Sequence, residues 1–277
     1  MNVEALPYTL LIILVELTIG SLWLTLASDL RGGVTRGFVL TMALCIAIAG
    51  VLALWTAASL EIGPEIDGYP IDPDPFPRLR TAVLVVTITA AIYMFAVFMG
   101  WDPIGRIAGI VGSLAGLAAI VLLAIMLAPP TWGYPAIFLG LFAGTLALGA
   151  VSVAMTWGHW YLTEGALPGW PLRDLCIALL GALALQVVVL ALNLVIPVRE
   201  TPTPANPVGV SLAENPVLYL RIGVGLVFPI ILAWLAYRTT AIRAMQSATG
   251  LLYIAMGAVF VGEVLAKGLL FISARPT

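Results

Sequence analysis

Long apolar runs decide the fold class of this chain. Eight runs are each long enough to cross the roughly 30 Å hydrocarbon core of a bilayer as a helix. They lack the strict apolar–polar alternation of a membrane β-barrel. We therefore predict an all-α integral membrane protein, with residues 1–277 forming one eight-helix transmembrane domain. The predicted helices are Tyr8–Ala27, Gly37–Ala58, Thr81–Gly100, Ile104–Leu127, Tyr134–Trp157, Asp174–Val198, Val217–Tyr237 and Ala248–Ser273.

Charged residues are scarce, which is typical of a membrane protein and argues against nucleic acid as a partner. They make up 9% of the chain, against about a quarter in soluble proteins. The net charge of -2 argues against nucleic acid as a partner and leaves the lipid bilayer as the expected surroundings. Cys45 and Cys176 lie in apolar runs and match no metal-ligand spacing. We expect both to be buried small hydrophobic side chains, and no metal to be bound by this chain.

Basic residues in the connecting loops predict the orientation. An even number of spans places both termini on one side of the membrane. Six arginines occupy the short loops of the other side, and the positive-inside rule makes that side cytoplasmic: Arg31, Arg36, Arg106, Arg173, Arg238 and Arg243. Both termini and the loops 59–80 and 199–216 are then extracytoplasmic. These loops are rich in proline, which predicts extended caps or a partner-docking face instead of regular helix.

Small residues recur at helix-packing spacing in several runs. Gly140 and Gly144 form a GxxxG pair, and Gly262 lies between Ala258 and Ala266 at the same spacing. Small residues allow helix backbones to approach closely where lipid offers no hydrophobic drive for association. The pattern predicts a compact bundle; a glycine face that makes room for a flat ligand is the alternative.

Charged and polar side chains inside the apolar runs are the main functional candidates. Burying a charge in a membrane costs at least a few kcal/mol, so such groups usually face the protein interior and pair, or line a polar cavity. Counted from the terminal side, Glu16, Glu263 and Lys267 lie about 12, 15 and 9 Å deep. Arg221 and Asn193 lie at about 7 Å. We expect these five groups, from four helices, to face one another in the extracytoplasmic half.

Two interpretations of this set remain open. In the structural one, Glu263 pairs with Lys267 one turn away on the same helix, and Glu16 pairs with Arg221. In the functional one, Glu16 or Glu263 exchanges protons with a bound substrate that Arg221 or Lys267 hydrogen-bonds. Two carboxylates with basic partners suit a quinone, because two-electron reduction of a quinone consumes two protons.

His159 and Pro229 are two further positions of interest. His159 is the only histidine, so a haem held by two axial histidines cannot form within this chain, and we expect no haem. Flanked by tryptophan and tyrosine, His159 is typical of the aromatic belt at a membrane surface; a route by which protons enter is the alternative. Pro229 is expected to kink the seventh helix just beyond Arg221.

The last two helices resemble a known family. The segments LRIGVGL from Leu220 and GEVLAKGLLF from Gly262 are similar to the closing helices of the NrfD-type membrane-anchor subunits of dimethyl sulfoxide reductase and polysulfide reductase. The resemblance covers about the last 55 residues and, more loosely, the polar position of Glu16 in the first helix. The family's polar residues in its second and third helices have no convincing match here, where these spans carry no charge.

The resemblance implies a membrane subunit of a respiratory redox complex in the cytoplasmic (inner) membrane of a prokaryote. Such a subunit binds menaquinone or ubiquinone near the extracytoplasmic face and exchanges electrons with iron–sulfur and catalytic subunits. Arg221, Glu263 and Lys267 match its motif positions. The competing interpretations are a structural or assembly subunit without a substrate and a small-solute transporter. A retinal Schiff base on Lys267, the only lysine, is a further alternative, although Glu263 one turn away accounts for this lysine equally well.

Overall fold

The computed structural model describes residues 5–66, 68–128, 134–164, 167–195 and 215–273. Its helices are α1 (Ala5–Arg31), α2 (Arg36–Ser59), α3 (Phe76–Met99), α4 (Asp102–Leu127), α5 (Tyr134–Glu164), α6 (Trp170–Val195), α7 (Pro216–Ile222), α8 (Phe228–Ala241) and α9 (Met245–Ser273). A π-helical segment, Gly223–Val227, joins α7 to α8 in one continuous span. Within the described residues, eight spans are long and apolar enough to cross a membrane, as predicted.

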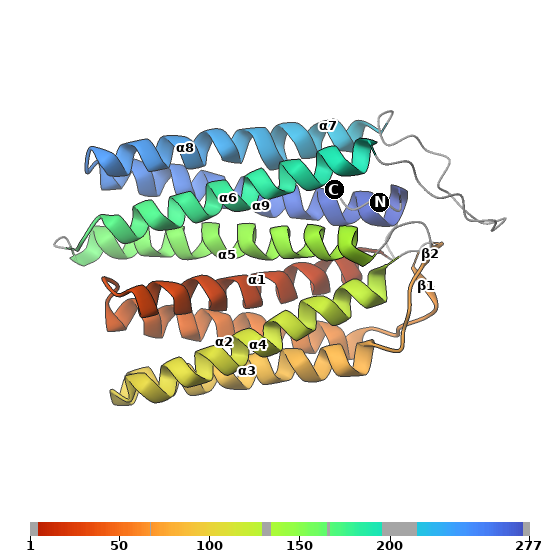
Figure 1. Ribbon diagram of the computed structural model, residues 1–277, viewed down its shortest axis with the longest axis horizontal. Coiled ribbons are helices and arrows are strands. Elements are labelled where there is room, and N and C mark those ends of the chain that lie inside the picture. Colours follow the sequence, from red (N-terminus) through yellow and green to blue (C-terminus); the bar gives the residue numbers. More distant parts are fainter. Residues whose placement is uncertain (1–4, 67, 129–133, 165–166, 196–214, 274–277) are drawn as a thin grey trace.

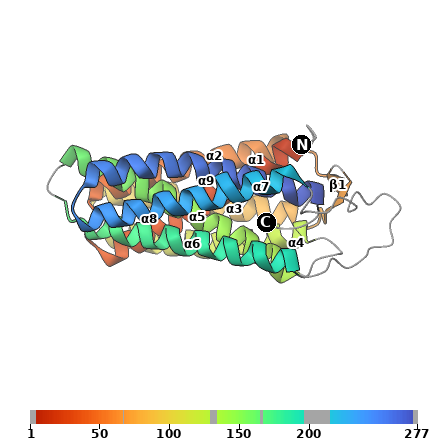
Figure 2. The ribbon, with the colours of Figure 1, turned by 90° about the horizontal axis from the view of Figure 1, so that it is seen from above.

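The eight spans form two groups of four. The groups lie one above the other in Figure 1, and Figure 2 shows the helices running along the long axis of the bundle. Helices α1 to α4 pack against one another in the first group. In the second group, α5 packs on α6 and α9, and the span of α7 and α8 packs on the same two helices. Contacts between the groups run mainly through α1, which packs on α5 and α9. Residues near the α1–α5–α9 junction therefore lie between the two groups.

Two glycines allow the groups to approach at backbone distance. A Cβ on Gly20 of α1 would overlap the carbonyl oxygen of Thr145 on α5, and a Cβ on Gly149 of α5 would overlap the backbone of Gly20. Within the first group, Gly116 of α4 lies against Ile19 of α1, and a Cβ on Gly116 would lie 2.8 Å from that side chain. Small residues thus allow close helix packing at these positions, of which Gly20 and Gly149 were not predicted from the sequence.

Capping residues define the ends of two helices. The Thr35 side chain accepts a hydrogen bond from the Phe38 backbone N–H at 3.3 Å, so it caps the start of α2. Gly100 ends α3 with a φ of 81°, the left-handed conformation common at helix C-termini. Pro77 lies in the first turn of α3, where a missing N–H costs nothing. The predicted loop 59–80 is therefore wrong at its first residue, which belongs to α2, and over its last five residues, which belong to α3.

The rest of that loop forms an ordered cap, as expected from its prolines. Strands β1 (Glu65–Ile66) and β2 (Tyr69–Pro70) pair as a short antiparallel hairpin. The buried Tyr69 hydroxyl donates to the Leu127 carbonyl at the end of α4, and its ring packs edge-on against Phe271 of α9, with centroids 5.6 Å apart. The hairpin thus joins both helix groups at the end of the bundle where α1 begins and α9 ends (Figure 1). The second predicted loop, 199–216, lies outside the described residues up to residue 214.

The outer surface of the bundle is apolar, as a lipid-facing surface must be. Large hydrophobic side chains such as Trp55, Ile107 and Leu114 are exposed there. Cys176 is buried, but Cys45 is exposed, so the prediction that both cysteines are buried is wrong for Cys45. Lipid tails are about as apolar as a protein core, so an apolar run alone does not reveal which of its faces is buried.

Candidate functional site

Five polar side chains from four helices meet inside the bundle and form what we call the buried polar cluster. Each is at most 5% exposed. The cluster consists of Glu16 on α1, Gln186 on α6, Arg221 on α7, and Glu263 and Lys267 on α9. It lies in the half of the bundle nearest the chain termini, because Glu16 is about 16 Å from the start of α1 and Glu263 about 15 Å from the end of α9 by helical rise.

Lys267 holds the two carboxylates together. Its ammonium lies 2.7 Å from Oε1 of Glu16 and 3.1 Å from Oε2 of Glu263. The second contact joins residues one turn apart on α9, as the sequence predicted. The first joins α1 to α9, and therefore one helix group to the other. One cation thus lies between two acids contributed by different halves of the bundle.

Arg221 and Gln186 complete the surroundings of Glu263. Nη2 of Arg221 lies 3.6 Å from Oε1 of Glu263 and donates to the Gln186 side-chain carbonyl at 3.0 Å. The Gln186 amide in turn donates to Oε1 of Glu263. Glu263 therefore interacts with two cations and one amide, and it is the most connected group of the cluster.

The π-helical segment gives Arg221 a further acceptor. Pro229 has no N–H, so it cannot donate the usual α-helical hydrogen bond to the carbonyl of Gly225. Nη1 of Arg221 donates to that oxygen instead, at 3.2 Å. A kink was predicted just beyond Arg221; the structure has a π-helical segment there, over Gly223–Val227.

Glycines make the space that the cluster occupies. A Cβ on Gly144 of α5 would lie 2.7 Å from Oε2 of Glu263 and 3.0 Å from Oε1 of Glu16. A Cβ on Gly225 would lie 2.6 Å from the Cα of Gly262, so the π-helical segment and α9 touch at backbone distance beside Arg221. The predicted GxxxG glycine of α5 therefore faces the two acids.

The charges of the cluster balance, yet two of its polar atoms remain without a partner. With Glu16, Glu263, Arg221 and Lys267 ionised, two negative charges face two positive ones. Within the described residues, Oε2 of Glu16 and Nε of Arg221 are buried and have no hydrogen-bond partner. Leaving such groups unsatisfied in a dry interior is costly; Oε2 of Glu16 can accept a proton or a hydrogen bond, whereas Nε of Arg221 can only donate one.

Four of the five predicted intramembrane residues meet in this cluster: Glu16, Arg221, Glu263 and Lys267. Asn193 is buried on α6, about 10 Å of helical rise beyond Gln186, and is not one of the five side chains. The expected ion pair of Glu16 with Arg221 is wrong, because Glu16 pairs with Lys267 and Arg221 pairs with Glu263. Gln186 was missed, although it is the one amide in the run ALALQVVVLAL.

The other predicted position lies apart from the cluster. His159 is exposed at the opposite end of the bundle, where its Nδ1 lies 2.9 Å from the Tyr253 hydroxyl. No group of three His, Cys, Asp or Glu side chains is placed to hold a metal ion in the part of the chain that the structure describes. Comparison of the chain with models of protein families, with curated proteins and with solved structures gives no match.

Proposed function

We propose that this chain is a quinone-interacting membrane-anchor subunit of a redox complex, of the NrfD type. In this proposal the buried polar cluster exchanges protons with menaquinol or ubiquinol, and electrons pass to an iron–sulfur partner subunit. The membrane is the inner membrane of a prokaryote, with both termini and the β1–β2 hairpin on the extracytoplasmic side.

The observation that carries the proposal is the unpartnered carboxylate oxygen of Glu16 inside the cluster. An acid that already meets Lys267 through one oxygen, and keeps the other free, is placed to accept a proton. The free Nε of Arg221 adds a donor for a carbonyl oxygen within the same cluster. Arg221, Glu263 and Lys267 are also the motif positions on which the family resemblance rests.

The test is quinol-linked turnover of the complex purified from native membranes through a tag on this chain. We expect Glu263→Gln and Arg221→Gln to lower turnover by about a hundredfold or more, since a positioned acid or base typically contributes that much. Glu164→Gln, at the exposed end of α5, is the matched control and should leave turnover unchanged. Wild-type turnover in both cluster variants, with the complex intact, would refute the proposal.

The second candidate is a structural or assembly subunit. It is favoured by one observation: each of the four charges has an opposite charge within 3.6 Å. In that case the cluster fixes helix positions, the copurified complex oxidises no quinol, and Glu263→Gln lowers the melting temperature of the subunit and the yield of its partners. Turnover and melting temperature measured on the same preparations therefore separate the two candidates.

A further inference from the structure

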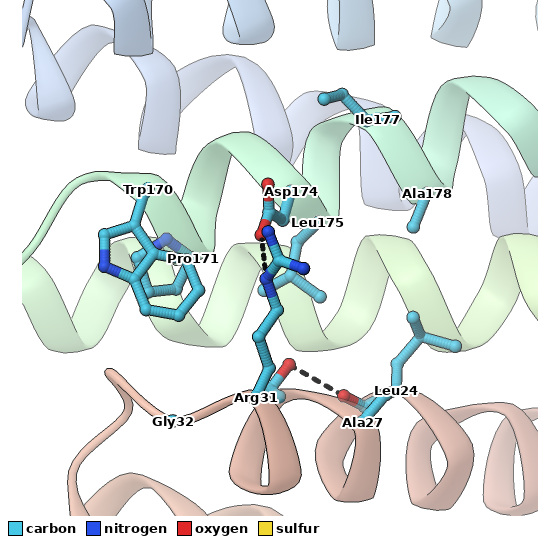
Figure 3. A pocket seen from close by; sticks show the side chains of 11 residues that line it. Leu24, Ala27, Arg31, Gly32, Trp170, Pro171, Asp174, Leu175, Ile177 and Ala178 are labelled. Carbon is cyan, nitrogen blue, oxygen red and sulfur yellow. Dashed lines mark hydrogen bonds and ion pairs between the residues drawn. The ribbon is translucent and has the colours of Figure 1, made fainter.

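A pocket opens between the two helix groups at the end of the bundle opposite the buried polar cluster. It has a volume of about 330 Å³ and lies between the last turns of α1 and the first turns of α6 (Figure 3). Volumes of this size are typical of small-ligand sites. Helix α5 packs on both α1 and α6 and so closes the space between them from behind. The position at two helix ends places the pocket at the boundary between hydrocarbon and lipid headgroups.

The mouth of the pocket carries one positive and one negative side chain. Nε of Arg31 lies 2.7 Å from Oδ2 of Asp174, and the Arg31 guanidinium lies 5.4 Å from the ring centre of Trp170. Figure 3 shows the arginine extending from α1 across to Asp174. Both charges are accessible, with side-chain exposures of 66% for Arg31 and 36% for Asp174.

The ion pair leaves binding capacity on both partners. The contact joins Nε of Arg31 to Oδ2 of Asp174 and does not use the two terminal nitrogens of Arg31 or Oδ1 of Asp174. Terminal guanidinium nitrogens are well suited to phosphate, which they bind as a fork. A free carboxylate oxygen suits an ammonium group. The two sites are neighbours, so one ligand that carries both charges can reach them together.

The walls below the mouth are apolar and lead into the hydrocarbon region. They are formed by Leu24 and Ala27 of α1 and by Leu175, Ile177 and Ala178 of α6. Ile177 is 50% exposed on the outer surface, so the pocket borders the lipid. A ligand that fits has a headgroup with two opposite charges and a hydrocarbon chain that continues into the bilayer.

We propose that this α1–α6 pocket binds one phospholipid with a zwitterionic headgroup, as in phosphatidylethanolamine. Arg31 binds the phosphate, Asp174 binds the ammonium, Trp170 covers the headgroup, and the first part of an acyl chain lies along the apolar wall. The bound lipid then fills the gap between the two helix groups on the side where α1 and α6 do not pack closely. This inference does not depend on the proposed redox role.

The experiment is native mass spectrometry of the purified protein in detergent micelles that contain phosphatidylethanolamine or phosphatidylglycerol. We expect wild type to retain one phosphatidylethanolamine and to prefer it to phosphatidylglycerol. Arg31→Gln should weaken retention about tenfold or more, the effect of one charged hydrogen bond. Ala178→Phe fills the pocket without changing either charge and should have the same effect. Asp174→Asn should remove the preference for the ammonium headgroup.

Arg36→Gln is the matched control. Arg36 pairs with Asp102 at 2.9 Å at the same end of the bundle, and neither residue lines the pocket. Its retention of phosphatidylethanolamine should equal that of wild type. Three results would each overturn the proposal: equal retention in wild type, Arg31→Gln and Ala178→Phe; preference of wild type for phosphatidylglycerol; or occupation of the pocket by a quinone instead of a phospholipid.

Discussion

The ammonium of Lys267 on α9 lies 2.7 Å from a carboxylate oxygen of Glu16 on α1. These residues come from opposite ends of the sequence and from different helix groups, so their ion pair joins the two halves of the molecule inside the membrane. Glu263 on α9 shares the same ammonium. The strength of this connection can be measured by removing its members singly and together.

Replacing Lys267 by methionine should destabilise the protein by about 3–5 kcal/mol, because a buried carboxylate on Glu16 then has no cation beside it. The double variant Glu16→Gln/Lys267→Met should recover part of this loss, since the orphaned charge is removed with its partner. The measurement is the free energy of unfolding in mixed micelles.

The exposed pair of Arg36 with Asp102 provides the control for this cycle. Arg36→Gln should change the free energy of unfolding by about 0–1 kcal/mol, as exposed ion pairs do. The ion pair would not hold the two helix groups together if Lys267→Met were as stable as wild type. The same conclusion would follow if the double variant had a lower free energy of unfolding than Lys267→Met and Glu16→Gln alone.

Gly144→Ala should disturb the cluster without changing its charges. The new methyl group would lie 2.7 Å from Glu263 and 3.0 Å from Glu16, and overpacking of this kind typically costs about 1–3 kcal/mol. Gly181→Ala is the matched control, because nothing lies within 4 Å of the position of its Cβ. A drop in melting temperature for Gly144→Ala alone is expected; equal melting temperatures would show that the acids have room to move.

Tyr69→Phe should loosen the cap over the bundle end. The change leaves the buried Leu127 carbonyl without the donor that now satisfies it, which costs about 1–3 kcal/mol. Tyr134→Phe is the control, because Tyr134 is partly exposed and stacks on Phe138 through its ring, which phenylalanine retains. The measurement is the free energy of unfolding of both variants at neutral pH. Equal values for the two variants would contradict a stabilising hydrogen bond from Tyr69 to Leu127.

The same tyrosine predicts a dependence on alkaline pH. Burial raises the pKa of Tyr69 above its usual value of about 10. The unfolded chain therefore loses this proton more readily than the folded one, and the stabilising contribution is complete below pH 10 and falls as the pH rises above it. Wild type should lose more stability than Tyr69→Phe between neutral pH and that range. Parallel pH profiles would contradict this.

The spans and the main polar cluster were predictable because membrane burial leaves strong signals in sequence. An apolar run inside the bilayer must form all of its backbone hydrogen bonds within itself, and an α-helix does so. A charge such as Glu16 or Arg221 must turn inward. Equal depth along the helices then brought these residues to one level, and the structure places them in contact.

The pairing within the cluster was not predictable, because it depends on how helices are rotated and which ones are neighbours. Their similar depth in the membrane allowed Glu16 to pair with Arg221. Because α1 packs beside α9, Glu16 pairs with Lys267 instead. Gln186 was overlooked because a neutral amide stands out less than a charge. The lipid-facing position of Cys45 was likewise hidden in a run that is apolar on every side.

The seam at Gly20 and Gly149 limits how this molecule can move. Two backbones in direct contact have no layer of side chains between them to rearrange, and the ion pair of Lys267 with Glu16 crosses the same junction. Alternating-access transport needs one half to rock against the other, and such rocking would break both the backbone contact and the ion pair. The two helix groups are therefore expected to keep a fixed arrangement, so that changes at the buried polar cluster are limited to small shifts of side chains and protons.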